Sequence, residues 1–298
     1  MKYLISLIIV SLSLTAYCQQ DIILTNNTYN NQLFNPAVAG SEGYKQGSVF
    51  VSYRDQWIGL EGSPKTQLIG ANYNLFDDRV GLGATLSRET IGIDSRIDLQ
   101  TNYAYRIKFD QNQYLSLGMR LGIHLYDSEL AAVNYTDSVD PIYDSGVGGF
   151  NVITTGLGAY YESESFGIGI SVPAIASISN ANTDFKTRHF YLHTKYAFYL
   201  SQYSDFKIEP SILIKYEPAA PVQYTFATQF FILPQFAVGF AYRSQDAFAL
   251  TSQFIIDKTL SLGVAFDFNT SELNTENNGS IEFIVGYKIN NDDNDPFR

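Results

Sequence analysis

The residues of this chain best suited to metal or acid–base chemistry are its three histidines, and their spacing argues against a shared site. His189 and His193 have the spacing of a zinc-binding pair on a helix, but on a strand two residues so spaced lie about 13 Å apart. His124 is isolated in sequence. We therefore predict three separate polar residues and no metal bound between His189 and His193.

Two further groups resemble ligand sites only in part. The acidic set is Asp137, Asp140 and Asp144, and the glycine set is Gly146, Gly148 and Gly149. The aspartates offer oxygen ligands for Ca²⁺, but their spacing is not that of a calcium loop. The glycines precede a predicted strand, whereas a phosphate loop opens a helix. No serine or cysteine stands in the sequence context of a catalytic nucleophile, so the sequence predicts no catalytic residue, no cofactor and no metal.

The composition fits neither a soluble domain nor a helical membrane protein. The 298 residues are 45% hydrophobic and 16% charged, whereas soluble domains carry about 25% charged residues. A helical span needs about 20 consecutive apolar residues, and no such run follows residue 16. Lys and Arg number 19 against 30 Asp and Glu, so the chain lacks the excess of cations that a nucleic-acid partner requires.

The N-terminus is typical of an exported protein. A basic residue precedes the apolar stretch from Leu4 to Leu14, and small residues follow it up to Cys18. This pattern predicts a secretory signal peptide over residues 1–18, with a mature chain that starts at Gln19. A lipoprotein acylated at Cys18 is the alternative, although the bulky Tyr17 before it fits that pattern poorly. Cys18 is the single cysteine, so no disulfide or zinc cluster forms within the chain.

The rest of the chain alternates between apolar and polar residues with period two, which predicts strands. Fourteen such runs can be counted, at residues 47–57, 65–76, 79–88, 96–109, 114–127, 150–161, 166–172, 188–200, 206–216, 222–233, 236–244, 248–256, 260–268 and 280–289. Fourteen is an even number, as bacterial outer-membrane barrels require.

Connections and aromatic residues support a barrel. Short turns alternate with connections that are mostly longer, the longest at residues 128–149, 173–187 and 269–279. Near the short turns stand aromatic residues expected to form an interfacial girdle, namely Phe76, Phe109, Tyr114, Tyr160, Tyr161, Phe166, Phe198, Tyr199, Phe206 and Phe236. We predict an all-β transmembrane antiparallel barrel of the outer membrane over residues 47–298, with a short acidic tail. A large soluble β protein is the alternative.

Lipid physics predicts which face each residue occupies. A Lys or Arg at the bilayer midplane costs about 2 to 4 kcal/mol, so we place in the lumen Arg54, Arg106, Arg120, Lys195, Lys207, Lys215 and Arg243. In the hairpin of runs four and five, Asp98 must lie opposite or diagonal to His124. Several lumen positions are glycine, among them Gly81 and Gly118, which allow the wall to curve or another segment to pack closely.

Two longer motifs carry a family resemblance. The strings FNPAVAG, residues 34–40, and YRDQWIGLEGSPKT, residues 53–66, resemble the PorP/SprF family of outer-membrane proteins attached to the type IX secretion system and gliding machinery of the Bacteroidetes. The chain departs from this family at its end, because an acidic tail follows the last strand after Ile289.

The resemblance implies a non-enzymatic outer-membrane protein that contacts lipid, type IX secretion components and a secreted surface adhesin. It also marks candidate docking residues, which are Asn35, Pro36, Gly40, Arg54, Gln56, Trp57, Gly62, Pro64 and Lys65. The alternative is that these residues only build the fold, as turn formers and strand ends.

Residues 19–46 are too short and too polar to form a domain of their own. We expect this segment to occupy or seal the periplasmic mouth of the barrel, as a plug or a periplasmic contact. Two other functions remain open on the sequence: a channel or fatty-acid-type transporter, because fourteen strands enclose a wide lumen, and an outer-membrane enzyme.

Overall fold

The computed structural model describes residues 22, 24–26, 31–41, 47–76, 78–110, 112–129, 149–180, 188–200, 206–218, 220–233, 235–256, 259–271 and 275–289. Two short helices precede the strands, α2 (Asn31–Phe34) and η2 (Pro36–Val38). No helix in these ranges is long and apolar enough to cross a membrane. The strands are β1 (Gly47–Asp55), β2 (Lys65–Leu75), β3 (Val80–Ile91), β4 (Asp94–Asp110), β5 (Gln113–Ser128), β6 (Phe150–Glu162), β7 (Phe166–Ser179), β8 (Phe190–Tyr196), β9 (Phe198–Tyr199), β10 (Lys207–Tyr216), β11 (Gln223–Leu233), β12 (Phe236–Arg243), β13 (Ala247–Ile256), β14 (Leu260–Asn269) and β15 (Ser280–Ile289).

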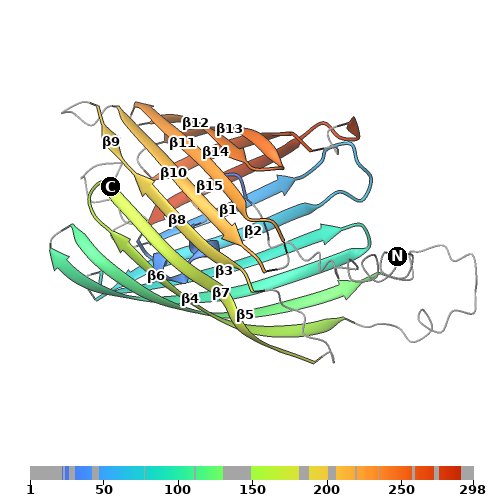
Figure 1. Cartoon of the computed structure of the whole chain (residues 1–298), viewed down its shortest axis with the longest axis horizontal. Coiled ribbons are helices and arrows are strands. Elements are labelled where there is room, and N and C mark those ends of the chain that lie inside the picture. The colour runs from blue at the N-terminus through green and yellow to red at the C-terminus, as the bar shows by residue number, and fades with distance from the viewer. Residues whose placement is uncertain are drawn as a thin grey trace, which may run out of the picture.

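These strands close into one antiparallel barrel (Figure 1). β1 pairs with β15 from Gly47 opposite Ile289 to Asp55 opposite Ile281, so the first and last strands seal the sheet. β8 and β9 both pair with β10 and are separated by Ala197 alone. They are two halves of one barrel strand, and the barrel has the fourteen strands that the sequence predicts.

The two ends of the barrel differ in their connections. Short turns join β2 to β3 and β4 to β5, whereas β5 and β6 are 21 residues apart, from residue 129 to 149, at the other end. We call these the short-turn end and the long-loop end, and in outer-membrane barrels the short turns face the periplasm. One connection at the long-loop end is nevertheless tight, because only Gly92 and Ile93 separate β3 from β4.

The predicted end of the seventh strand is wrong. The sequence predicts that this strand stops at residue 172, but β7 continues to Ser179. Its pairing with β6 shifts register between Thr155 and Leu157 and then resumes, with Thr155 opposite Ala176. The shift interrupts the period-two pattern close to Pro173, which made the second half of the strand look like a loop.

The two faces of the barrel wall follow the predicted assignment. On the lipid side, Leu99, Leu117 and Leu121 are exposed by 45%, 49% and 49%. Five of the seven basic residues assigned to the lumen are buried, and Lys195 and Lys215 line cavities inside the barrel. An apolar outer face and a polar interior are what a membrane barrel requires.

Two residues predicted for the aromatic girdle turn inward instead. Tyr160 is buried and packs against Ala37 and Val38 in the lumen, and the Tyr114 hydroxyl donates a hydrogen bond to Glu162. In both strands the even-numbered residues face the lumen, and Tyr114 and Tyr160 are among them. Phe76 and Phe109 stay on the outside, exposed by 74% and 63%.

Candidate functional site

The lumen contains the described part of the N-terminal region. Residues 22, 24–26 and 31–41, which we call the lumen segment, contact the inner wall through buried side chains and backbone. Leu24 packs with Phe50, Leu68 and Ile284 of the wall. The segment extends from charged residues near the long-loop end to the start of β3 near the short-turn end, so it occupies more of the lumen than one mouth.

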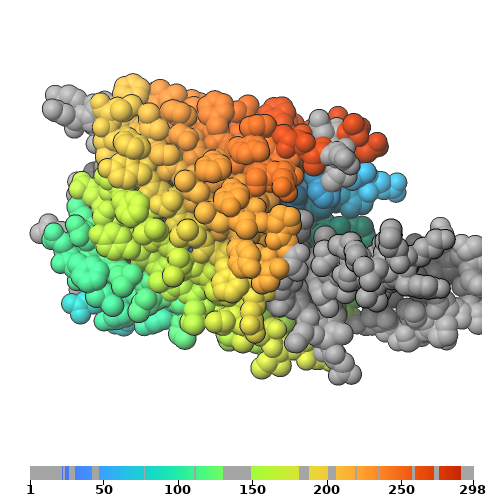
Figure 2. Space-filling model, viewed as in Figure 1, coloured from blue at the N-terminus to red at the C-terminus, as the bar shows by residue number. Residues whose placement is uncertain are grey.

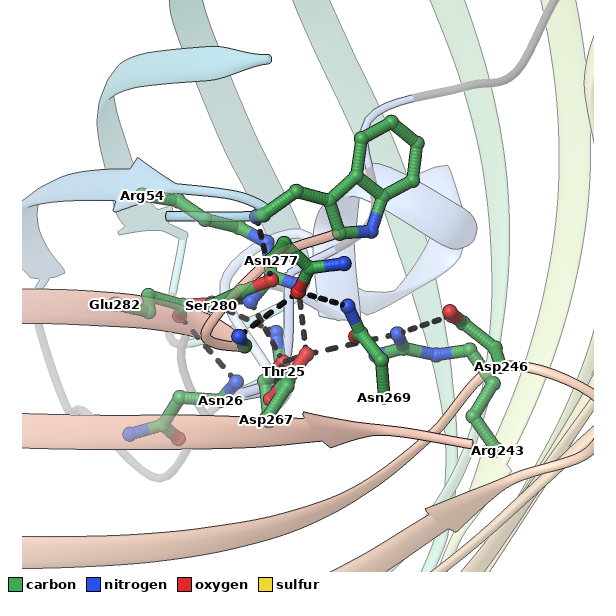
Figure 3. Close-up of polar contacts among 12 residues, drawn as sticks. Thr25, Asn26, Arg54, Arg243, Asp246, Asp267, Asn269, Asn277, Ser280 and Glu282 are labelled. Atoms are coloured by element: carbon green, nitrogen blue, oxygen red, sulfur yellow. Dashed lines mark hydrogen bonds and ion pairs between the residues drawn. The ribbon is translucent and has the colours of Figure 1, made fainter. Parts of the chain in front are cut away.

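At the long-loop end, three charged side chains from neighbouring strands form a buried ion cluster (Figure 3). Arg54 of β1 lies 2.7 Å from Asp267 of β14 and 3.4 Å from Glu282 of β15, measured between guanidinium nitrogen and carboxylate oxygen. Each of the three residues is 1% exposed. Arg54 and Glu282 are directly opposed in the β1–β15 ladder, so the closure of the barrel assembles this cluster.

The ion cluster binds Thr25 and Asn26 of the lumen segment. The Thr25 backbone N–H donates to Glu282 at 2.7 Å, and the Thr25 hydroxyl donates to Asp267 at 2.7 Å. Arg54 in turn donates to the Thr25 hydroxyl oxygen at 2.8 Å, and the Asn26 N–H donates to Glu282 at 3.3 Å. Charge-assisted bonds of this kind are stronger than neutral ones.

At mid-depth, wall side chains satisfy the end of helix α2. The last carbonyls of a helix have no partner within the helix. Here Arg120 donates to the carbonyl oxygens of Gln32 and Leu33, the latter at 2.8 Å, and Ser171 donates to that of Phe34 at 2.7 Å. Arg120 is itself held by Asn102 at 2.8 Å. The predicted lumen arginine thus acts as a helix cap.

Asn35 fixes the turn that follows α2. Its side-chain oxygen accepts from the Ala37 N–H at 2.9 Å, which caps η2. Its amide nitrogen donates to the carbonyl of Ala159 at 3.0 Å and lies 3.2 Å from Nε2 of His193. The same nitrogen also lies 3.4 Å from the Ile170 carbonyl oxygen, so one asparagine shapes the lumen segment and ties it to three strands of the wall.

Glycines in the wall make room for the segment, which confirms the close packing that the sequence suggested. A Cβ at Gly118 would overlap the backbone of Ala37, and one at Gly81 would overlap the carbonyl of Ala39. Near this point Arg106 donates to the Ala39 carbonyl at 2.7 Å. Gly40 ends the turn with φ +70°, a conformation that glycine adopts without strain.

His124 lies directly opposite Asp98, as predicted, and forms a buried chain of hydrogen bonds. Its Nδ1 is 2.6 Å from Asp98, and its Nε2 is 2.9 Å from the Thr154 hydroxyl. The order of groups resembles that of a hydrolase triad, but the adjoining cavity has a volume of about 50 Å³. Such a cavity holds water and excludes a substrate of ordinary size, for which pockets measure roughly 300 to 1,000 Å³.

The other candidate ligands do not converge. His189 bonds to Glu217 at 2.9 Å, whereas His193 contacts Asn35 and stacks on Tyr160. Within the described ranges, no three or more His, Cys, Asp or Glu side chains are placed to hold a metal ion. Asp137, Asp140, Asp144, Gly146 and Gly148 lie outside those ranges.

The predicted docking residues separate into two groups. Asn35, Pro36, Gly40 and Arg54 are buried in the lumen. Gln56, Trp57, Gly62 and Pro64 belong to the connection between β1 and β2 at the long-loop end, and Lys65 begins β2. Gly62 and Lys65 are exposed, whereas Pro64 is buried.

The β1–β2 connection, residues 56–64, is fastened to the segment before β15. The N–H of Trp57 donates to the Ser280 hydroxyl at 3.2 Å, and the N–H of Ile58 donates to the Gly279 carbonyl at 2.8 Å. Trp57 itself has φ 51°, which is uncommon for a residue other than glycine. This loop and the ion cluster therefore both lie where β1 pairs with β15, a junction that we call the seam.

Sequence reasoning missed Thr25, Asp267 and Glu282. A carboxylate in a membrane strand also belongs in the lumen, so the facing rule already places Asp267 and Glu282 there. Their meeting with Arg54 depends on the closure of the barrel, and the position of Thr25 depends on the path of the lumen segment.

The fold and the lipid-facing wall define this protein as an outer-membrane β-barrel. Structures with the same fold include the monoaromatic hydrocarbon channel CymD, with a TM-score of 0.54, 10% identity, and coverage of 90% of this chain and 94% of that one. The outer membrane protein Omp33 of Acinetobacter baumannii gives a TM-score of 0.51 at 10% identity, covering 83% of this chain and 99% of that one.

The family is more specific. A model of the family described as type IX secretion system membrane protein PorP/SprF matches residues 16–287, and the chain belongs to this family. A search of curated proteins gave no match.

Proposed function

We propose that this protein is a docking barrel of the type IX secretion and gliding machinery, which supports the secretion or surface attachment of a large adhesin. The membership of the PorP/SprF family supports a role in type IX secretion. The adhesin and the machinery subunits that it would contact are the proposed part.

The position of the lumen segment inside the barrel is the observation that carries this proposal. Arg54, Arg106 and Arg120 each bond to the lumen segment from a different part of the wall. A transport channel would need a path through this region, whereas a docking protein needs none. In this proposal the protein acts by binding a partner and catalyses no reaction.

The rims are the proposed contact surface. Docking through Asn35, Pro36, Gly40 or Arg54 would require the lumen segment to leave the barrel, because all four are buried. Pro64 is buried as well, so we assign docking at the long-loop end to Gln56, Trp57, Gly62 and Lys65, together with neighbouring loops. Mixed polar and aromatic surface of this kind is enriched at protein interfaces.

The test is a gene deletion complemented with variants. We expect the deletion to release or misplace a large surface protein, measured on washed cells and in the medium, while other outer-membrane barrels assemble normally. Complementation with a chain that carries Gln56→Ala, Trp57→Ala and Lys65→Ala together should fail, although the barrel inserts. Complementation with Thr101→Val, a lipid-facing change, should succeed.

A channel or fatty-acid-type transporter is the competing function. CymD shares only the fold with this chain, at 10% identity. An unchanged surface profile and secretome in the deletion strain, together with a new defect in uptake of a small solute, would reject the docking proposal in favour of the channel. Hydrolysis of lipid or peptide by the purified barrel would reject the non-enzymatic role.

A further inference from the structure

The described part of the lipid-facing wall contains a groove of ligand size. It crosses β6, β7, β8 and β10 and has a volume of about 580 Å³, within the range of roughly 300 to 1,000 Å³ of small-molecule sites. We call it the wall groove. Its sides are formed by Leu157, Ile170, Phe190, Leu192, Ile214 and Tyr216. Figure 2 shows the outer surface of the wall on the side of these strands, coloured yellow-green to gold.

One small residue creates the hollow. A row of directly opposed, outward-facing positions crosses the wall through Leu117, Ala159, Ile170, Leu192, Ile214 and Tyr224. Ala159 is the one small side chain in this row, and it stands between Leu117 and Ile170. Because neighbours in such a row lie about 5 Å apart, an alanine among large side chains leaves a depression open to the bilayer.

The end of a ladder lengthens the groove. β7 pairs with β8 from Phe166 opposite Tyr196 to Ser171 opposite Tyr191, and β7 then continues along β6 alone in the described part of the chain. The floor at this point is closed from inside. The Tyr191 ring is 5.4 Å from that of Phe34, and Ser171 donates to the Phe34 carbonyl. The groove therefore ends on Ser171 and Tyr191, the two wall residues that contact Phe34 of the lumen segment.

We propose that the wall groove binds one acyl chain of a membrane phospholipid. The groove is continuous with the lipid-facing wall, where the neighbouring Ile170 and Leu117 are exposed by 61% and 49%. No Lys, Arg, Asp or Glu lines it, so its contacts suit a hydrocarbon chain and offer nothing for a charged headgroup. This site goes beyond the proposed docking function, and it connects membrane lipid to the lumen segment through Tyr191.

The test uses the full-length refolded protein, with 1-palmitoyl-2-oleoyl phosphatidylethanolamine as the probe and native mass spectrometry as the measurement. We expect the wild-type barrel to retain one phospholipid after detergent exchange. Ala159→Trp fills the groove and should lower the retained fraction at least fivefold. Ala84→Trp is the matched control, because Ala84 is an exposed lipid-facing alanine on β3, away from the groove; it should retain lipid as the wild type does.

Three results would overturn the proposal: no phospholipid on the wild type, equal retention by the two tryptophan variants, or retention of sodium oleate in place of the phospholipid. Heat-modifiable gel mobility checks that each variant is folded. If Ala159→Trp does not refold, Ile214→Phe narrows the groove from β10, and the same loss of phospholipid is expected.

Discussion

Replacing Arg54 by alanine should destabilise the barrel far more than replacing an exposed cation on the neighbouring strand β2. Arg54→Ala leaves Asp267 and Glu282 buried, each 1% exposed, with their main cation removed. Breaking a buried ion pair from one side costs about 3 to 5 kcal/mol. Lys65→Ala is the control, because its pair with Asp55 spans 3.9 Å and Lys65 is 53% exposed. Exposed pairs contribute about 0 to 1 kcal/mol.

The measurement is urea-induced equilibrium unfolding of the barrel in lipid vesicles. The single tryptophan, Trp57, lies three residues after Arg54 and reports on this end of the barrel by fluorescence, while circular dichroism follows the strands. Adding Glu282→Gln to Arg54→Ala removes one unpaired charge and should restore part of the stability. A loss for Arg54→Ala no larger than that for Lys65→Ala would refute the buried ion cluster.

Further predictions concern the membrane, the lumen segment and the N-terminus. Leu121→Arg should block insertion, since a lipid-facing Arg near the midplane costs about 2 to 4 kcal/mol; Leu121→Met should insert normally in a heat-modifiability assay. Gly118→Leu should expel the lumen segment and expose it to protease, whereas Ala84→Leu, on the exposed lipid-facing side of β3, should leave it protected. Deleting residues 21–40 should raise ion conductance in a planar bilayer, and an unchanged conductance would contradict a plug. The measured intact mass should be that of a mature protein that begins at Gln19.

The wall was predictable because membrane physics acts on each residue separately. Alternation, the cost of a lipid-facing charge and an even number of runs place Arg54, Arg120 and Leu121 on their faces without knowledge of any neighbour. The opposed pair of Asp98 and His124 also follows, because a short turn fixes the register of a hairpin. Each of these inferences uses residues close together in the sequence.

What failed depends on exceptions to the pattern. The register shift beside Pro173 hid the second half of β7, and Tyr160 was assigned to the girdle by its residue type although its position has lumen parity.

The path of the lumen segment was beyond local reasoning for a thermodynamic reason. Arg54 and Glu282 are 228 residues apart and meet only when the barrel closes, so the binding site for Thr25 does not exist in any smaller part of the chain. The binding site for Thr25 therefore forms only when the barrel does. Thr25 can bind in this way only after the first and last strands have paired.

The same arrangement limits how a partner could act on the barrel. A ligand shifts an equilibrium only by its difference in affinity for the two states. To displace the lumen segment, a partner must therefore offset the bonds from Arg54 and Arg120 as well as the buried carboxylates that Thr25 now satisfies. The β1–β2 loop contacts Ser280 through Trp57, and Ser280 is paired with Asp267 of the ion cluster. In the proposed docking, a partner bound at this loop would therefore act on the seam between β1 and β15 that holds Thr25, and a partner that leaves this seam intact would leave Thr25 in place.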